Sequence, residues 1–396
     1  TTIAGYLLDG ADGRTLAVES RMNPQAQYGA DVIMRANYAL EHGTEALSMC
    51  VRKAVNEMLG SLAEDAGIRR EDVFQVCVVG NTCMHHLFLG ISPASLVHAP
   101  YTPAVSERLV LNAGDYGLAV QERAELIMLS DIAGYVGADT CGCLLAIRQD
   151  QQEEISLMID IGTNGEMVLG NRERMVTCST AAGPAFEGAK IECGMRGAAG
   201  AVDHVKYEDG KWNYTTVGNK PAVGLCGSGL IDLVAGLLDA GMLDENGVLR
   251  SGQEKQGVFI LVPPERGGNE RGVYLTQKDL GEVQLAKAAI AAGIQMLMER
   301  LGITEDDICS VYIAGAFGNY MDPVSAGKIG LLPATLVKKV KPVGNAAGEG
   351  AKIALVNEKE MLEMDELVRK IEFVELAASA DFQDHFIDEL GFETGE

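Results

Sequence analysis

Two stretches of the chain repeat one another, and this repeat restricts the possible folds more than any other feature. Residues 66–81 read AGIRREDVFQVCVVGN and residues 301–316 read LGITEDDICSVYIAGA, and they align without gaps. Each follows a long segment with the apolar spacing of a helix, at 44–65 and at 281–301, and each contains an apolar strand-like run that ends in glycine. A helix, a strand and a glycine loop that recur in the same order indicate an internal duplication.

Two weaker correspondences follow the same order along the chain. Three strands joined by turns are predicted at ISLMIDI (155–161), EMVLG (166–170) and RMVTCST (174–180). When Thr1 is laid on Thr163, the first residues, TTIAGYLLD (1–9) and RTLAVES (14–20), match the last two of these strands. The first copy's own Asp-x-Gly is then expected upstream of residue 1.

The third pair consists of AGYVGADTCGCLLAI (133–147) and GNAAGEGAKIALV (344–356), both small-residue loops that open an apolar helix. Together the repeats predict an α/β fold of two related lobes, residues 1–150 and 151–396, with a cleft between them. The second lobe is expected to carry an insertion near 184–280, and polar, turn-rich segments lie at 207–219 and 262–272. The acidic segment 357–376 has helical spacing followed by a strand-like run.

Composition narrows the class of partner. The 32 basic and 56 acidic side chains give a net charge of −24, so the surface should repel nucleic acid and anionic lipid. No run of about eighteen apolar residues predicts a membrane span. The nine cysteines are scattered through apolar runs, which is typical of reduced thiols in a cytoplasmic protein. Cys141 and Cys143 are the only close pair, too few ligands for a zinc or iron–sulfur site.

Residues 158–166, MIDIGTNGE, place an acid inside an apolar strand that runs into a loop with two glycines. One interpretation is a plain hairpin, because Asn-Gly is a strong signal for a tight turn. The other is a phosphate-binding loop, in which backbone N–H groups meet anionic oxygens and Asp160 holds Mg²⁺ through water. Thr163 and Asn164 would add side-chain donors, whereas Glu166 could simply face solvent.

These motifs resemble those of the actin, sugar kinase and heat-shock chaperone superfamily of ATPases (ASKHA), which has duplicated actin-like (ribonuclease H-like) lobes with an interlobe nucleotide cleft. More narrowly, the chain resembles the ATPase portion of reductive activators of corrinoid proteins over about residues 1–356. The motifs that carry this resemblance are VVGNTCMHHLFLGISP, GYVGADT, STAAGPAFEGAKIECGMRGA, GLCGSGLIDLVAGLL, IAGAFGNYMDP and GNAAGEGAK.

The resemblance implies a function. Members of that family use ATP to drive the uphill one-electron reduction of cobalt(II) to cobalt(I) in a corrinoid (cobalamin-binding) partner protein of a methyltransferase or O-demethylase system. The electron enters through an N-terminal plant-type iron–sulfur domain, and an external donor such as a ferredoxin is expected. Because no Cys-x4-Cys-x2-Cys occurs here, that cluster is expected only in a domain missing from this sequence.

The resemblance also assigns residues to a nucleotide site. Asp160 and Asp139 are the candidate catalytic carboxylates, and Asp160 is the candidate Mg²⁺ ligand. The residues that match phosphate and adenosine loops are Thr1 and Thr2 for the tail of the first phosphate loop, Gly162, Thr163, Asn164, Gly165 and Glu166 for the second, and Gly315, Ala316, Phe317 and Gly318 for the adenosine loop. Ala316 departs from the pattern, because many relatives have glycine there.

Further polar residues have both structural and functional interpretations. Asn81 follows a strand end and would cap a helix or contact phosphate. Gly227 and Ser228 open an apolar helix, where an anion or a simple cap would fit. Glu187 would meet the ribose hydroxyls of ATP, or merely pair with a lysine one turn on. The adjacent pair His85 and His86 is expected to pack or cap a helix rather than to bind cobalt.

Two other functions remain open at this stage. A small-molecule kinase of the same superfamily would need a catalytic base that faces a substrate pocket. A non-catalytic, nucleotide-dependent binding module would bind ATP without turnover. A homodimer is possible in each case.

Overall fold

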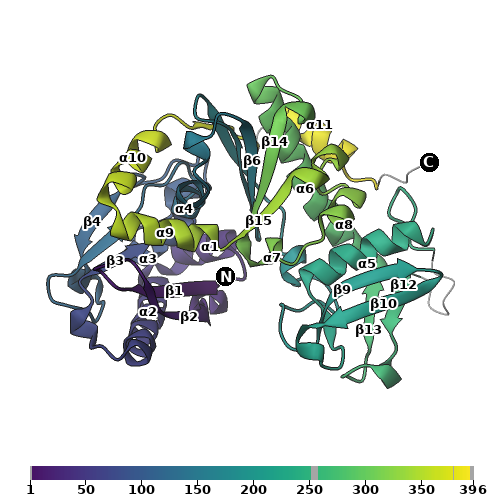
Figure 1. The fold of residues 1–396 in the computed structure, drawn as a ribbon, viewed down its shortest axis with the longest axis horizontal. Helices are drawn as coiled ribbons and strands as arrows, with labels where there is room; N and C mark the ends of the chain where they lie inside the picture. Colours follow the sequence, from purple (N-terminus) through teal and green to yellow (C-terminus); the bar gives the residue numbers. More distant parts are fainter. Residues whose placement is uncertain (1, 251–256, 378, 393–396) are drawn as a thin grey trace. The chain divides into compact units, whose positions relative to one another are not determined.

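A computed structural model describes residues 2–250, 257–377 and 379–392, except for the side chain of Ala316. The chain forms two compact units (Figure 1). The first unit consists of Thr1–Gln151 and Asn345–Phe373, and the second of Gln152–Gly344 and Val374–Glu396. Both contain helices and strands, so the predicted α/β class is confirmed.

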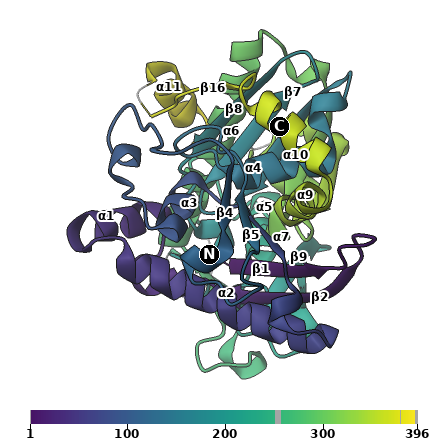
Figure 2. The same ribbon diagram turned by 90° about the vertical axis from the view of Figure 1, so that its left-hand side faces the viewer.

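In the first unit, β1 and β2 form an antiparallel hairpin, and a separate sheet has the order β3-β5-β4. The elements of the unit are β1 (Thr2–Leu8), β2 (Thr15–Met22), α1 (Val32–His42), α2 (Glu45–Ala66), β3 (Gln75–Val78), α3 (Thr82–Leu89), β4 (Leu109–Asn112), β5 (Glu125–Met128), α4 (Ala138–Ile147), α9 (Ala346–Val356), α10 (Glu358–Val368) and β16 (Glu372–Phe373). Helix α2 runs along the hairpin and buries Leu59 and Leu62 against Leu7 and Ala17 (Figure 2).

In the second unit, the central sheet has the order β15-β14-β6-β7-β8. Strand β14 is parallel to both neighbours, and the β6–β7 and β7–β8 pairs are antiparallel. The elements are β6 (Ile155–Ile161), β7 (Gly165–Gly170), β8 (Met175–Thr180), β9 (Ala201–Glu208), β10 (Lys211–Thr216), β11 (Gly224–Leu225), α5 (Gly227–Asp239), β12 (Val258–Val262), β13 (Val273–Thr276), α6 (Gln277–Leu301), β14 (Ile308–Ala314), α7 (Gly315–Gly318), α8 (Pro323–Lys328), β15 (Val340–Gly344) and α11 (Ala380–Asp388). The three predicted strands of this unit are therefore present.

The strongest sequence repeat has the same local structure in both units. Helices α2 and α6 both end at a left-handed glycine, Gly67 with φ +68° and Gly302 with φ +69°. The aligned aspartates then accept a backbone N–H from three residues earlier, at 3.0 Å for Asp72 and 2.8 Å for Asp307. The residues shared by the two copies therefore have the same structural roles. In each copy the glycine ends the helix, and the aspartate caps the turn that leads into the strand.

The segment 345–373 belongs to the first unit, whereas the sequence placed the only division at 150/151. The reason is close packing of α9 on α4. A Cβ atom on Gly350 would lie 1.8 Å from the carbonyl oxygen of Gly142, so the two helices touch through their backbones. Arg108, just before β4, and Asp365 of α10 add an ion pair at 2.8 Å. The second of these contacts joins residues 257 positions apart, which no local pattern reveals.

The insertion of the second unit folds into small sheets and the helix α5. Most of the polar stretch 207–219 is a β-hairpin, in which β9 and β10 are joined through Asp209 (φ +51°) and Gly210 (φ +74°). Positive φ at both positions is the geometry of a type I′ turn, which matches the twist of the two strands. Residues 263–272 connect β12 to β13, and this segment is the loop that the sequence predicts.

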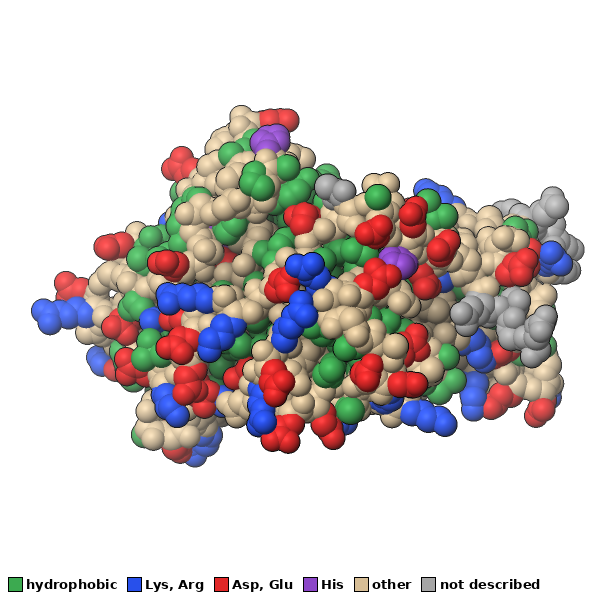
Figure 3. All heavy atoms as spheres, turned by 90° about the horizontal axis from the view of Figure 1, so that it is seen from above, with side chains coloured by type: hydrophobic (Ala, Val, Ile, Leu, Met, Phe, Trp, Pro, Cys, Tyr) green, Lys and Arg blue, Asp and Glu red, His purple; other side chains and the backbone are tan. Residues whose placement is uncertain are grey.

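Among the described residues, no helix is long and apolar enough to cross a membrane. On the face drawn in Figure 3, acidic and basic side chains are interspersed and do not gather by sign.

Candidate functional site

The two glycines of the loop between β6 and β7 are glycine for different reasons. A Cβ on Gly165 would lie 2.9 Å from Thr180 Oγ1 and 3.2 Å from Ile290, so packing requires a glycine there. A Cβ on Gly162 would meet nothing closer than 3.7 Å, and its φ is not in the left-handed region. Its N–H donates to Asn164 O (2.9 Å), which closes the turn. The fold itself does not require glycine at 162. A ligand that approaches the backbone closely would require it, because a side chain would block that approach.

Two carboxylates face each other at the loop end of this hairpin. Asp160 and Glu166 are direct cross-strand partners in the β6–β7 register. Glu166 is buried, and the Ser179 hydroxyl donates to its Oε1 at 3.5 Å. Like charges placed directly opposite each other on a sheet are destabilising, so a cation bound near both would relieve their repulsion.

The adenosine-loop candidates begin beside Asp160. Ala314, at the end of β14, is the parallel neighbour of Asp160, and Gly315 follows it with φ +87°. A Cβ on Gly315 would lie 2.9 Å from Asp160 Oδ1. Glycine is therefore needed at 315 for the backbone conformation and for the space that Asp160 occupies. The fold brings these two sequence motifs together at the carboxyl ends of neighbouring strands.

Two more segments border the same loop. The ring of Phe317 stacks on Phe186, from the short helix Ala185–Glu187, with centroids 5.7 Å apart and an interplanar angle of 14°. A Cβ on Gly227, the first residue of α5, would lie 2.7 Å from the Phe317 ring and 2.1 Å from Phe186 O. A Cβ on Gly318 would lie 2.5 Å from Ile313. Gly315, Phe317, Gly318 and Gly227 are thus brought together, and Phe186 is a neighbour that the sequence analysis missed.

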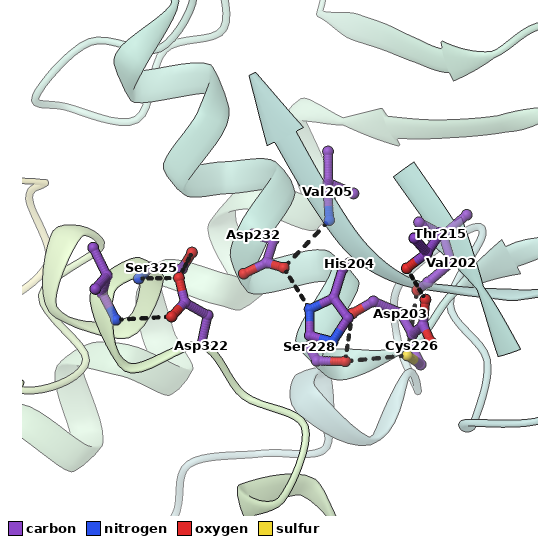
Figure 4. A network of polar contacts seen from close by, with 11 residues as sticks. Val202, Asp203, His204, Val205, Thr215, Cys226, Ser228, Asp232, Asp322 and Ser325 are labelled. Carbon is purple, nitrogen blue, oxygen red and sulfur yellow. Dashed lines mark hydrogen bonds and ion pairs between the residues drawn. The ribbon is translucent and has the colours of Figure 1, made fainter. Parts of the chain in front are cut away.

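Three of the predicted side chains make contacts within the protein. Thr163 donates its hydroxyl to the Glu187 carboxylate, a partner that the sequence analysis did not expect. Lys190, the lysine one turn on, pairs instead with Glu282 at 3.5 Å. Ser228 donates its hydroxyl to Asp203 O at 2.8 Å, which ties α5 to β9 (Figure 4).

In the first unit, Asn81 serves as a helix cap. Its Oδ1 accepts the N–H of Cys83 at 3.1 Å and its amide donates to Tyr135 O at 3.1 Å. Thr2 is exposed at the start of β1, and Thr1 lies outside the described residues. Both histidines of the Met-His-His segment are buried in α3, so the packing interpretation is confirmed.

Asp139 begins α4 close to a buried ion pair that the sequence analysis missed. His85 Nδ1 lies 3.2 Å from Asp131 Oδ1, and both side chains are at most 5% exposed. Burial raises the pKa of Asp139 to about 6, although the Thr140 N–H and the charge of His85 lower it. Burial would lower the pKa of His85, but Asp131 and the nearby Asp139 raise it overall. The pKa of Asp139 therefore lies closer to neutral pH than that of an ordinary aspartate.

No group of three or more His, Cys, Asp or Glu side chains among the described residues could hold a metal ion. Mg²⁺ in nucleotide enzymes is usually bound by one or two carboxylates together with phosphates and water, and the Asp160 and Glu166 pair fits only that mode. Cys141 and Cys143 are fully buried in α4, where burial raises the pKa of Cys141 well above its ordinary value.

Comparison with known protein families shows that the chain contains an ASKHA domain. A family model described as "C-terminal domain of RACo the ASKHA domain" matches residues 154–396, and one described as "RACo middle region" matches residues 1–152. The chain therefore belongs to the RACo family of reductive activators, and the family predicted from its motifs is confirmed.

Three relatives place the chain within this family. It is 35% identical over 405 residues to "Corrinoid activation enzyme RamQ" of Eubacterium limosum, which covers 98% of this chain and 68% of the relative. It is 27% identical over 399 residues to "[Co(II) methylated amine-specific corrinoid protein] reductase" of Methanosarcina barkeri, which covers 92% of this chain and 71% of the relative. A solved structure, "Reductive activator for corrinoid,iron-sulfur protein", matches with a TM-score of 0.90 and 37% identity, and the match covers 99% of this chain but only 64% of that one.

Proposed function

We propose that this chain is the nucleotide-hydrolysing part of an ATP-dependent reductive activator, which restores cobalt(I) in a corrinoid protein of a methyltransferase or O-demethylase system. The names of its relatives support the corrinoid partner. The observation that carries the ATP dependence is the apposition of Asp160 and Gly315, because it joins a phosphate-loop candidate to an adenosine-loop candidate.

Each loop has a distinct role in this proposal. The open backbone at Gly162 and Asn164 contacts phosphate oxygens, and the segment that contains Gly315 and Phe317 binds the adenosine. Asp160, with Glu166 opposite, is the residue that would hold Mg²⁺, which neutralises phosphate charge. In the first unit, Asp139 is proposed as a second catalytic carboxylate. With a pKa of about 6 it is largely ionised at neutral pH and can accept a proton from water.

The redox step transfers one electron to cobalt(II) and gives cobalt(I), and hydrolysis of ATP by water gives ADP and phosphate. The electron comes from a reduced iron–sulfur centre, in an N-terminal domain or in a ferredoxin-type donor. ATP assists the uphill step only if it binds one state of the activator and corrinoid complex more tightly than the other. A homodimer stays a prediction.

The proposal is tested with purified full-length protein, its corrinoid partner and a low-potential electron donor. We expect ATP with Mg²⁺ to raise the cobalt(I) absorbance, and Asp160→Ala to abolish this rise while the protein remains folded. The matched control is Glu173→Ala, an exposed acid in the other turn of the same sheet, between β7 and β8. Cobalt(I) formation without any need for ATP would refute the proposal.

Two other outcomes would favour the alternatives. Phosphate transfer from ATP to a sugar or carboxylate would indicate a small-molecule kinase. Tight ATP binding without turnover would indicate a nucleotide-dependent binding module. Unchanged turnover in Asp160→Ala would refute the metal role of Asp160 alone.

A further inference from the structure

The start of helix α5 packs against the adenosine-loop candidate Phe317. Its first residue, Gly227, leaves no space between the helix and the Phe317 ring, since a Cβ there would lie 2.7 Å from that ring. A small shift of α5 along its axis would therefore push or release Phe317. The position of the helix start depends on whatever fixes α5 in its place.

Several polar contacts fix α5 against β9 (Figure 4). The Ser228 hydroxyl donates to Asp203 O at 2.8 Å. One turn further along, Asp232 Oδ2 accepts the N–H of Val205 at 3.2 Å and lies 3.1 Å from His204 Nδ1. Asp232 therefore fixes the position of α5 along β9, because it contacts both the backbone and a side chain of that strand.

The far end of α5 is joined to α8, the helix that follows the adenosine-loop segment. Lys328 Nζ lies 2.6 Å from both oxygens of Asp239. Asp232 Oδ1 is buried and makes no hydrogen bond within the described residues, and Ser325 of α8, on that side, donates to Asp322 at 3.0 Å. Helix α5 thus lies between the strand β9 and the element connected to Phe317.

Asp232 is an unusual residue for its place. Its side chain is only 5% exposed, and its neighbours in α5, such as Ile231 and Leu233, are fully buried and apolar. Burial raises the pKa of Asp232, against the lowering effect of the Val205 N–H and of His204. An apolar side chain could fill this place at lower desolvation cost, but it would not fix the position of the helix by directional bonds.

We propose that Asp232 is a positioning residue for nucleotide recognition: held by His204 and the Val205 backbone, it sets α5 so that Gly227 and Phe317 form the surface that accepts the adenine ring. The inference rests on the proposed ATP-binding function. It predicts that Asp232 affects the recognition of adenosine and leaves the recognition of phosphates unchanged, since the phosphate-loop candidates lie on β6 and β7.

The test compares two ligands on the full-length protein by calorimetry: ATP and inorganic tripolyphosphate, both with Mg²⁺. Asp232→Leu should weaken ATP binding about tenfold or more and leave tripolyphosphate binding unchanged. Asp232→Asn, which keeps an acceptor for the Val205 N–H, should restore most of the ATP affinity. The matched control is Asp239→Leu, the same change on the same helix. The ion pair of Asp239 with Lys328 is solvent-exposed and adds little to the position of α5, so this variant should alter neither affinity.

The outcomes separate this inference from the function on which it rests. A wild-type protein that binds neither ligand would contradict both. A wild-type protein that binds ATP, together with an Asp232→Leu variant that loses both ligands equally or neither, would overturn the positioning role alone. If Asp232→Leu does not fold, His204→Ala replaces it, because this side chain is 49% exposed. It should lower the ratio of ATP to tripolyphosphate affinity about threefold, and an unchanged ratio would overturn the inference.

Discussion

Replacement of Gly315 by alanine, compared with the same change at another left-handed glycine, tests whether Gly315 serves nucleotide binding as well as the backbone conformation. Gly315 has φ +87°, and an added Cβ would lie 2.9 Å from Asp160 Oδ1. An ordinary van der Waals contact begins near 3.4 Å, so the carboxylate or the loop must move by 3.4 − 2.9 = 0.5 Å. The positive φ costs a further ~1–2 kcal/mol for a residue that has a Cβ.

A displacement of this size matters because a ligand-binding constellation must be held within about 0.5 Å of its productive geometry. We therefore expect Gly315→Ala to lower the affinity for Mg²⁺-ATP about 10- to 100-fold, by analogy with the effect of disturbing a metal site. The affinity for ATP in the presence of a Mg²⁺ chelator should fall much less, since Asp160 would then make no metal contact.

The control is Gly302→Ala at the end of α6. Gly302 has φ +69°, yet a Cβ there would meet nothing within 4 Å. Gly302→Ala should lose about 1–2 kcal/mol of unfolding free energy in urea, because alanine is forced into positive φ, and Gly315→Ala should lose at least as much. Only Gly315→Ala should lose Mg²⁺-ATP affinity in calorimetry. Equal effects of the two variants on binding, or full affinity in Gly315→Ala, would refute the reasoning.

Three further predictions concern other parts of the chain. Asp139→Asn should be about 1–3 kcal/mol more stable than wild type above pH 6, because folding then buries the charged form of Asp139. The difference should shrink as the pH falls below the folded pKa of about 6, and it should vanish below the ordinary aspartate pKa of 3.8, where both states are protonated. Urea unfolding at several pH values checks this, and a lower stability of the variant at pH 7.5 would contradict it. Gly350→Ala should destabilise the protein by about 1–3 kcal/mol in urea unfolding, since its Cβ would meet Gly142 O at 1.8 Å; wild-type stability would show that α4 and α9 can separate freely. Phe317→Ala should weaken ATP binding about tenfold in calorimetry through loss of aromatic stacking, and equal weakening of tripolyphosphate would argue against an adenosine role.

Much of the fold follows from local sequence signals. The helix predicted over 44–65 is α2, Glu45–Ala66, and its end is fixed by Gly67, a residue visible in the repeat. The helix predicted over 281–301 begins earlier, at Gln277, because Thr276 and Asp279 form a capping box that periodicity alone does not reveal. The helix expected after residue 357 is also present, as α10, Glu358–Val368.

Some residues of the candidate site were likewise detectable in the sequence, and others were found only in the structure. Asp160 was detectable as an acid in an apolar strand, and the same signal would have found Asp232, the single acid in the apolar run GLIDLVAGLL. Phe186 gave no such signal, because its stacking partner, Phe317, is distant in the chain. The ion pair of His85 with Asp131 gave none either, because 46 positions separate the two residues. For Thr163 and Ser228, the sequence offered a donor, and the structure decided where the hydroxyl points.

The printed sequence was sufficient to indicate the two helix, strand and glycine modules, the phosphate-loop and adenosine-loop candidates, and the family. The modules are local and repeated, so hydrophobic periodicity and turn chemistry indicate them, whereas the family and the nucleotide-binding roles of the loops follow from the resemblance of their motifs. Three features are visible only in the folded protein: residues 345–373 join the first unit, Gly315 lies against Asp160, and Asp232 of α5 is bonded to β9. Those outcomes depend on close packing and directional hydrogen bonds between segments far apart in the chain, and such contacts leave no periodic pattern in either partner.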